Sequence, residues 1–129
     1  WVSLNNMPGL DVEEIEIYNR FFEILKFPAV YFVPDWILMS LGMFDSKNLF
    51  LATSCVKRLT MEQRMEVLIH EAAHLIEMKA KGFEGGCLDD KEDKRDLSLT
   101  HQQDRGFAWA YKVASLVMAE AVKSTPTLL

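Results

Sequence analysis

The segment from residue 59 to residue 82 constrains the fold most, because its ends and its internal repeat predict one long helix. Thr60 followed by Gln63 has the spacing of a capping box, and Gly82 is a typical helix stop. Between these ends, apolar side chains recur at helical spacing, namely Met65, Leu68, Ile69, Ala72, Leu75 and Ile76. The segment is therefore predicted to be a helix that buries one face in the core.

The middle of this helix carries His70-Glu71-Ala72-Ala73-His74, which is the H-E-x-x-H pattern. Residues four apart share one face of a helix, so the two imidazoles can close on a single ion. Histidines and a glutamate on a partly buried face are costly unless something satisfies them. We expect Zn²⁺ to do so, with His70 and His74 as ligands and Glu71 as the base for a zinc-bound water. The alternative is two histidines satisfied by solvent or by the core.

A zinc ion held by two histidines needs a third protein ligand, and a catalytic site keeps a further position for water. His101 is the only other histidine, and a capping-box pattern at residues 100–103 would place it in the first turn of a helix. Asp104 lies one turn further on the same face and is the alternative third ligand. Glu77 is too far along the motif helix to reach the ion, and Glu120 lies near the far end of the last predicted helix.

A second helix is predicted near the start of the chain, where Asp11 and Glu14 repeat the capping-box spacing. This helix should run to about Lys26, because Pro28 follows it. Its apolar stripe is wide enough to cover a sheet and consists of Ile15, Tyr18, Phe22 and Leu25, with Phe21 and Ile24 beside them.

The remaining elements predict an α+β fold with one small sheet. Short apolar runs predict strands at 29–33, 37–44 and 48–53, and the turn residues at 45–48 favour a hairpin between the last two. We expect a mostly antiparallel, three-stranded sheet that precedes the motif helix. Residues 89–96 are all charged and predict a solvated loop, and a final helix is expected from about Thr100 to Lys123.

Length and charge indicate one domain, residues 1–129, with a lead-in at 1–10 and a tail at 124–129. A net charge of −5 without a basic stripe argues against nucleic-acid binding, and no apolar run is long enough for a membrane span. Cys55 and Cys87 do not make a disulfide framework, so a cytoplasmic, intracellular location is expected. Because the chain begins at Trp1 and not at methionine, we expect it to be part of a longer chain or complex.

The order of these elements resembles SprT-like zinc metallopeptidases over roughly residues 11 to 120. The resemblance is carried by His70-Glu71-Ala72-Ala73-His74, by the hairpin at Leu41-Gly42-Met43-Phe44-Asp45, and by His101 followed by Phe107 on a later helix. It implies a zincin-like fold and hydrolysis of peptide bonds in a protein or peptide substrate.

The resemblance also implies where a substrate would lie. Zincin substrates commonly pair as an extra strand with the sheet edge over the metal, and residues 48–53 are the expected edge. A tyrosine often helps to hold the oxyanion, and Tyr111 is available, although its spacing favours a core position.

Two further functions stay open beside a zinc metallopeptidase. One is a zinc-stabilised protein-binding or sensor module with little turnover. Glu71 disfavours this function, because a structural zinc site needs ligands but no general base. The other is a metal-dependent hydrolase that acts on a bond other than a peptide bond.

Overall fold

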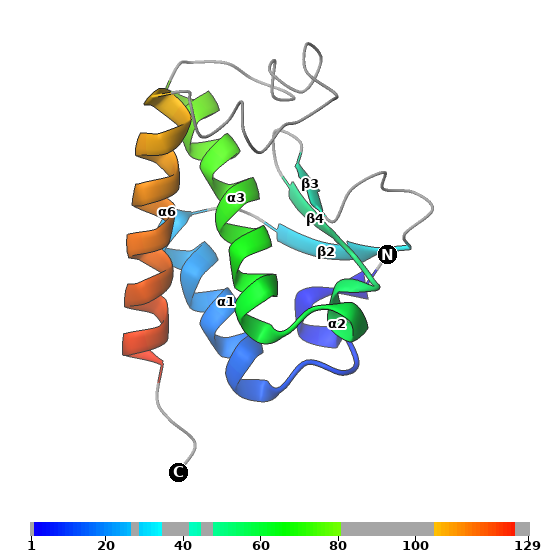
Figure 1. Ribbon diagram of the computed structural model, residues 1–129. Coiled ribbons are helices and arrows are strands. Elements are labelled where there is room, and N and C mark those ends of the chain that lie inside the picture. Colours follow the sequence, from blue (N-terminus) through cyan, green and yellow to red (C-terminus); the bar gives the residue numbers. More distant parts are fainter. Residues whose placement is uncertain (1, 27–28, 35–41, 45–47, 81–104, 126–129) are drawn as a thin grey trace.

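The computed structural model describes residues 2–26, 29–34, 42–44, 48–80 and 105–125, and their fold is α+β (Figure 1). Its helices are α1 (Val12–Leu25), α2 (Cys55–Arg58), α3 (Met61–Ala80) and α6 (Arg105–Ser124), with a 3₁₀ turn at Leu4–Asn6. Its strands are β1 (Val2–Ser3), β2 (Ala29–Val33), β3 (Gly42–Phe44) and β4 (Asn48–Ala52). The α+β class and the bounds of β2 match the expectations from sequence.

The sheet has four strands in the order β1-β2-β4-β3 and is mixed. Strands β2 and β4 run parallel over their full length, with Ala29 opposite Asn48 and Val33 opposite Ala52. Strand β1 pairs antiparallel with β2, and β3 pairs antiparallel with β4 as the expected hairpin requires. The prediction of a three-stranded, mostly antiparallel sheet is therefore confirmed only in part, because two pairings are antiparallel but the central one is parallel and β1 adds a strand.

Residues 2–10 belong to the fold and are not a lead-in, contrary to expectation. Val2 pairs with Phe32 in the sheet, and the side chains of Leu4 and Met7 are buried in the main core. The expected turn before α1 is present at Gly9, whose φ of +92° favours glycine. A Cβ atom there would also come within 2.8 Å of Val56 Cγ1, so glycine allows the turn to pack closely.

The sheet edge also differs from the expected one. Strand β4 lies between β2 and β3, so residues 48–52 are interior and cannot accept a further strand. The edge on this side is β3, and β3 contacts α3, the helix that carries the motif.

Helix α1 begins after Asp11 as predicted, but Asp11 makes no side-chain cap. The side chain of Glu14 does not complete a capping box with Asp11, because it is buried and accepts hydrogen bonds from Arg64 of α3. The buried face of α1 is also rotated slightly from the predicted apolar stripe, because Ile17 is buried and Ile24 is exposed. The helix ends where Lys26 adopts the left-handed conformation, with φ of 59°.

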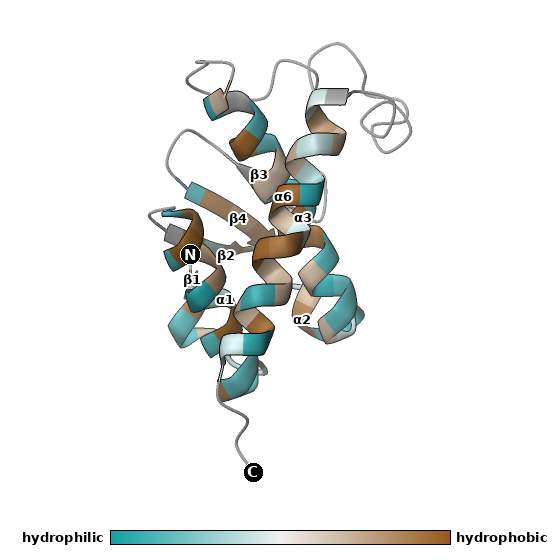
Figure 2. Ribbon diagram, turned by 90° about the vertical axis from the view of Figure 1, so that its left-hand side faces the viewer, coloured by the Kyte–Doolittle hydropathy of each residue, from teal (hydrophilic) through white to brown (hydrophobic). Residues whose placement is uncertain are grey.

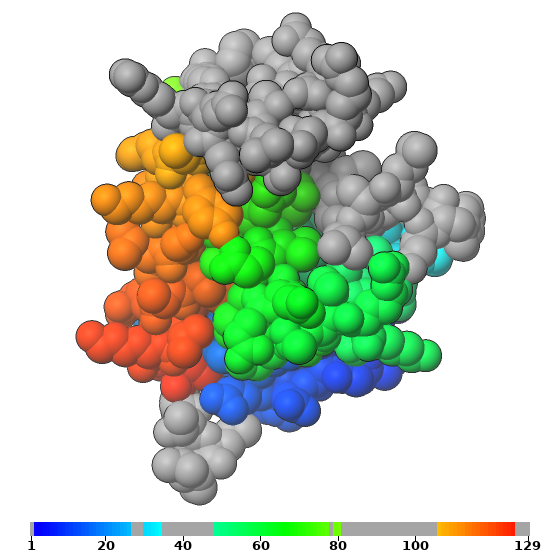
Figure 3. Space-filling model, in the orientation of Figure 1, coloured from blue at the N-terminus to red at the C-terminus, as the bar shows by residue number. Residues whose placement is uncertain are grey.

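Helices α1, α3 and α6 form the layer beside the sheet, and α6 contacts both of the others (Figures 1 and 2). On the face shown in Figure 3, side chains of α3 and α6 abut along both helices. Their shared core joins the sheet and includes Phe21, Phe32, Leu49, Leu68 and Ala114. None of the helices among the described residues is both long and apolar enough to cross a membrane.

Several expectations fall on residues outside the described part of the chain. They are the stop at Gly82, the charged segment 89–96, the start of the last helix at 100–104, the turn at 45–47, residues 37–41, Cys87 and the tail from residue 126. Cys55 is described, and its side chain is buried.

Candidate metal centre on helix α3

The motif helix begins with the capping box that its sequence predicts. The backbone N–H of Thr60 donates to Gln63 Oε1 at 2.9 Å, and the N–H of Gln63 donates to Thr60 Oγ1 at 3.2 Å. These reciprocal bonds satisfy two donors at the helix start. The motif follows from residue 70, in the middle of the 20-residue helix.

A buried ion pair fastens the first turn of α3 to α1. Arg64 donates to both carboxylate oxygens of Glu14 at 2.7 Å, and the hydroxyl of Tyr18 donates to Glu14 at 2.7 Å. Arg64 Nη1 also donates to backbone carbonyls of residues 55, 56 and 59 around the end of α2. Burial and the bond to Glu14 raise the pKa of Tyr18 well above its usual range. The network therefore sets the position of the helix that carries the motif.

The two motif histidines converge at their Nε2 atoms. His70 Nε2 and His74 Nε2 are 3.2 Å apart, and the ring planes lie at 80° to each other. Two imidazole nitrogens on one tetrahedral zinc ion, each about 2.0–2.1 Å from it, are about 3.3 Å apart. The spacing of the pair therefore fits a shared zinc ion. It also fits a hydrogen bond between the rings when one Nε2 carries a proton.

Phe107 on α6 packs against both imidazoles. Its ring centroid lies 5.2 Å from that of His70 and 4.8 Å from that of His74, and the phenyl ring is buried. Such contacts restrict the rotation of both imidazoles about their side-chain bonds. The sequence pattern predicted Phe107 on a later helix but not this contact, because helical spacing does not show which helices pack together.

The site is only partly open to solvent. His74 is 4% exposed, Glu71 is also buried, and His70 is half-buried. Glu71 follows His70 in the chain, and a buried carboxylate next to a possible metal ligand is a candidate for a functional group.

A contact between Tyr111 of α6 and Glu66 of α3 lies next to the histidine pair. Glu66 precedes His70 by one turn, and the hydroxyl of Tyr111 donates to Glu66 Oε2. Burial first, and then this bond, raise the pKa of Tyr111 to about 12. The ring of Tyr111 lies 6.1 Å from that of Phe107 and packs on the core, in line with the expected core position. Glu66 was not among the residues predicted for the site. Its spacing of four residues before His70 could have indicated that both lie on one face of the helix.

Both candidates for a third ligand, His101 and Asp104, lie outside the described residues. Within the described part of the chain, no three histidine, cysteine or carboxylate side chains are placed to hold one ion. Glu77, which is buried on α3, does not join the histidine pair, in agreement with the expectation that it is too far along the helix.

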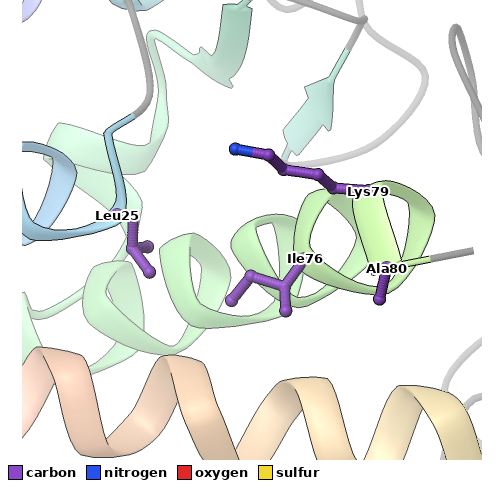
Figure 4. A pocket seen from close by; sticks show the side chains of 4 residues that line it. All are labelled: Leu25, Ile76, Lys79 and Ala80. Carbon is purple, nitrogen blue, oxygen red and sulfur yellow. The ribbon is translucent and has the colours of Figure 1, made fainter. Parts of the chain in front are cut away.

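A separate groove of about 250 Å³ opens between the ends of α1 and α3 (Figure 4). Its described walls are Leu25, Ile76, Lys79 and Ala80, so the motif histidines and Glu71 are not among them. The groove is small, shallow and mostly apolar, and it supplies no group for acid–base or metal chemistry except the ammonium of Lys79.

A comparison with protein-family models, with curated proteins and with solved structures finds no match to this chain.

Proposed function

We propose that this chain is a zinc-dependent metallopeptidase of the SprT-like, zincin type, with His70 and His74 as two of the zinc ligands. The observation that carries the proposal is the 3.2 Å separation of the two Nε2 atoms, with the buried carboxylate of Glu71 beside His70 in the chain. Neutral imidazole pairs at this spacing suit zinc, and the H-E-x-x-H pattern adds the base that hydrolysis needs.

The third ligand is proposed to be His101, with Asp104 as the alternative. Phe107 already lies against both imidazoles, and the two candidates precede it by six and three residues in the chain. The chain is thus long enough to bring either side chain to the histidine pair. Imidazole is preferred because zinc beside two histidines is often completed by a third.

The proposed reaction uses Glu71 as the proton carrier. Zinc, when bound, supplies a Lewis acid that polarises the scissile carbonyl and lowers the pKa of water toward 7. Glu71 accepts a proton from the attacking water and passes it to the leaving amine, so one carboxylate serves as base and then as acid. Phe107 keeps both imidazoles in place during this transfer.

A protein or peptide substrate is proposed to bind along β3. This strand is an edge of the sheet and contacts α3, so an extended peptide paired with it would run beside the motif helix. Main-chain pairing of this kind tolerates many side chains. None of the described helices could span a membrane, and the net charge of −5 argues against binding to nucleic acid.

The first test measures zinc and hydrolysis together. Protein purified without chelators should contain about one zinc per chain, and His70→Ala should lose it. Glu71→Gln should keep the zinc but cleave an unstructured protein at least about a hundred times more slowly. Glu62→Gln is the matched control, because Glu62 is exposed on the same helix. Cleavage by Glu71→Gln at the parental rate would rule out Glu71 as the base.

A second candidate function is a zinc-stabilised binding or sensor module. The burial of His74 and the packing of Phe107 against both rings favour it, since structural sites are closed to solvent. It predicts bound zinc, a large loss of stability on chelation, and no cleavage by either the parent or Glu71→Gln.

A further inference from the structure

Helix α6 has an exposed outer face in addition to the face that supports the site. Trp109 is 52% exposed and Leu116 is 62% exposed, although both are large and apolar. Figure 2 looks onto α6 from this outer side, and no other described element lies in front of it. Large apolar side chains at helical spacing, on a face that no described element covers, indicate a surface on which another helix can pack.

The exposed residues on this face form what we call the outer stripe, which is Trp109, Lys112, Leu116, Glu120 and Lys123. Their successive spacings are three, four, four and three, which place all five side chains on one side of the helix. The spacing is also symmetric about Leu116. A copy of α6 running in the opposite direction therefore matches the outer stripe position by position.

The charges of the outer stripe suit this antiparallel match. With Leu116 opposite Leu116 of a second copy, Lys112 faces Glu120 of that copy, and Trp109 faces Lys123. The first contact is an ion pair and the second a cation–π contact, and each occurs twice in a symmetric dimer. A parallel match would set Lys112 against Lys112 and Glu120 against Glu120, which is repulsive.

We propose that the outer stripe is the interface of an antiparallel dimer of this chain. The dimer is expected to be weak, because the stripe from Trp109 to Lys123 covers only about 21 Å of helix. One such helix pair buries less surface area than a standard protein–protein interface. We therefore expect a dissociation constant of about 10–100 µM. The proposal does not depend on zinc or on catalysis, since the histidines contact the opposite face of α6.

The test is sedimentation velocity of the 129-residue chain over a concentration series that spans this range. The parent should shift from monomer to dimer, and Leu116→Glu should remain a monomer with unchanged circular dichroism. Val12→Glu is the matched control, since Val12 is 62% exposed on α1 and the change adds the same charge. It should dimerise as the parent does.

A charge exchange tests the antiparallel register. Lys112→Glu should weaken the dimer at least about tenfold, because Glu120 of the second copy then faces a like charge. Lys112→Glu combined with Glu120→Lys should restore the parental constant. A parent that stays monomeric throughout, a Leu116→Glu variant that still dimerises, or a double variant that is not restored would each overturn the proposal.

Discussion

Replacing Arg64 with methionine should destabilise the protein more than any single change on its surface. The side chain length is nearly kept, but both bonds to Glu14 and the bonds to three backbone carbonyls are lost. The carboxylate of Glu14 is then left 2% exposed with its cation removed. Breaking a buried pair in this way costs about 3–5 kcal/mol of unfolding free energy.

That loss is a large part of the stability of an ordinary domain, which is about 5–15 kcal/mol. For a chain of this size it corresponds to a fall in Tm of about 10–20 °C, measurable by circular dichroism. Urea unfolding gives the free energy directly. The matched control is Arg20→Met, because Arg20 and Glu23 form a surface pair at 3.5 Å with side chains 46% and 71% exposed. Its loss should stay below about 0.5 kcal/mol.

A double-mutant cycle identifies the cause. If the unpaired carboxylate is responsible, then adding Glu14→Gln to Arg64→Met should recover part of the loss. A coupling energy of about 2–3 kcal/mol is expected. A loss of less than about 1 kcal/mol in Arg64→Met, or a coupling near zero, would refute the view that this pair anchors α3 to α1.

Three further predictions concern the site. Phe107→Leu should lower zinc affinity about tenfold or more by freeing the imidazoles, whereas Phe22→Leu, equally buried on α1, should lower stability without changing zinc affinity. Tyr111 favours the fold in its neutral form, so its contribution is full below pH 10 and is lost as the pH rises through about 12. Tyr111→Phe should therefore show a shallower loss of stability over this range in pH-dependent unfolding. In a zinc-competition titration, His101→Ala should weaken binding far more than Asp104→Ala, and the reverse order would make Asp104 the ligand.

Local patterns predicted the motif helix and β2 well, because the signals for their ends lie within the same segment. The bonds between Thr60 and Gln63 span three residues, and their geometry follows from the helix start itself. Strand β1 and the parallel pairing of β2 with β4 were missed, because such pairing depends on distant segments. The wrong choice of edge strand followed from the same error, since sequence order does not give the order of strands in a sheet.

Glu14 and Gln63 show how one sequence pattern can have two outcomes. Each stands three residues after a possible cap, but only Gln63 turns back to the helix start. Glu14 instead meets Arg64, fifty residues away, because its position on α1 faces the core between Tyr18 and α3. A charged pair in that position gains more from mutual bonding than a cap on the surface would give.

The candidate metal centre was predictable only in part for a similar reason. His70 and His74 lie on one helix, so a four-residue spacing was enough to bring their Nε2 atoms to 3.2 Å. The groups around them come from α6, which reaches α3 only through the packing of the core, and Phe107 arrives by that route. Helix α6 thus orders the proposed ligands with its inner face and leaves Trp109 and Leu116 on its outer face.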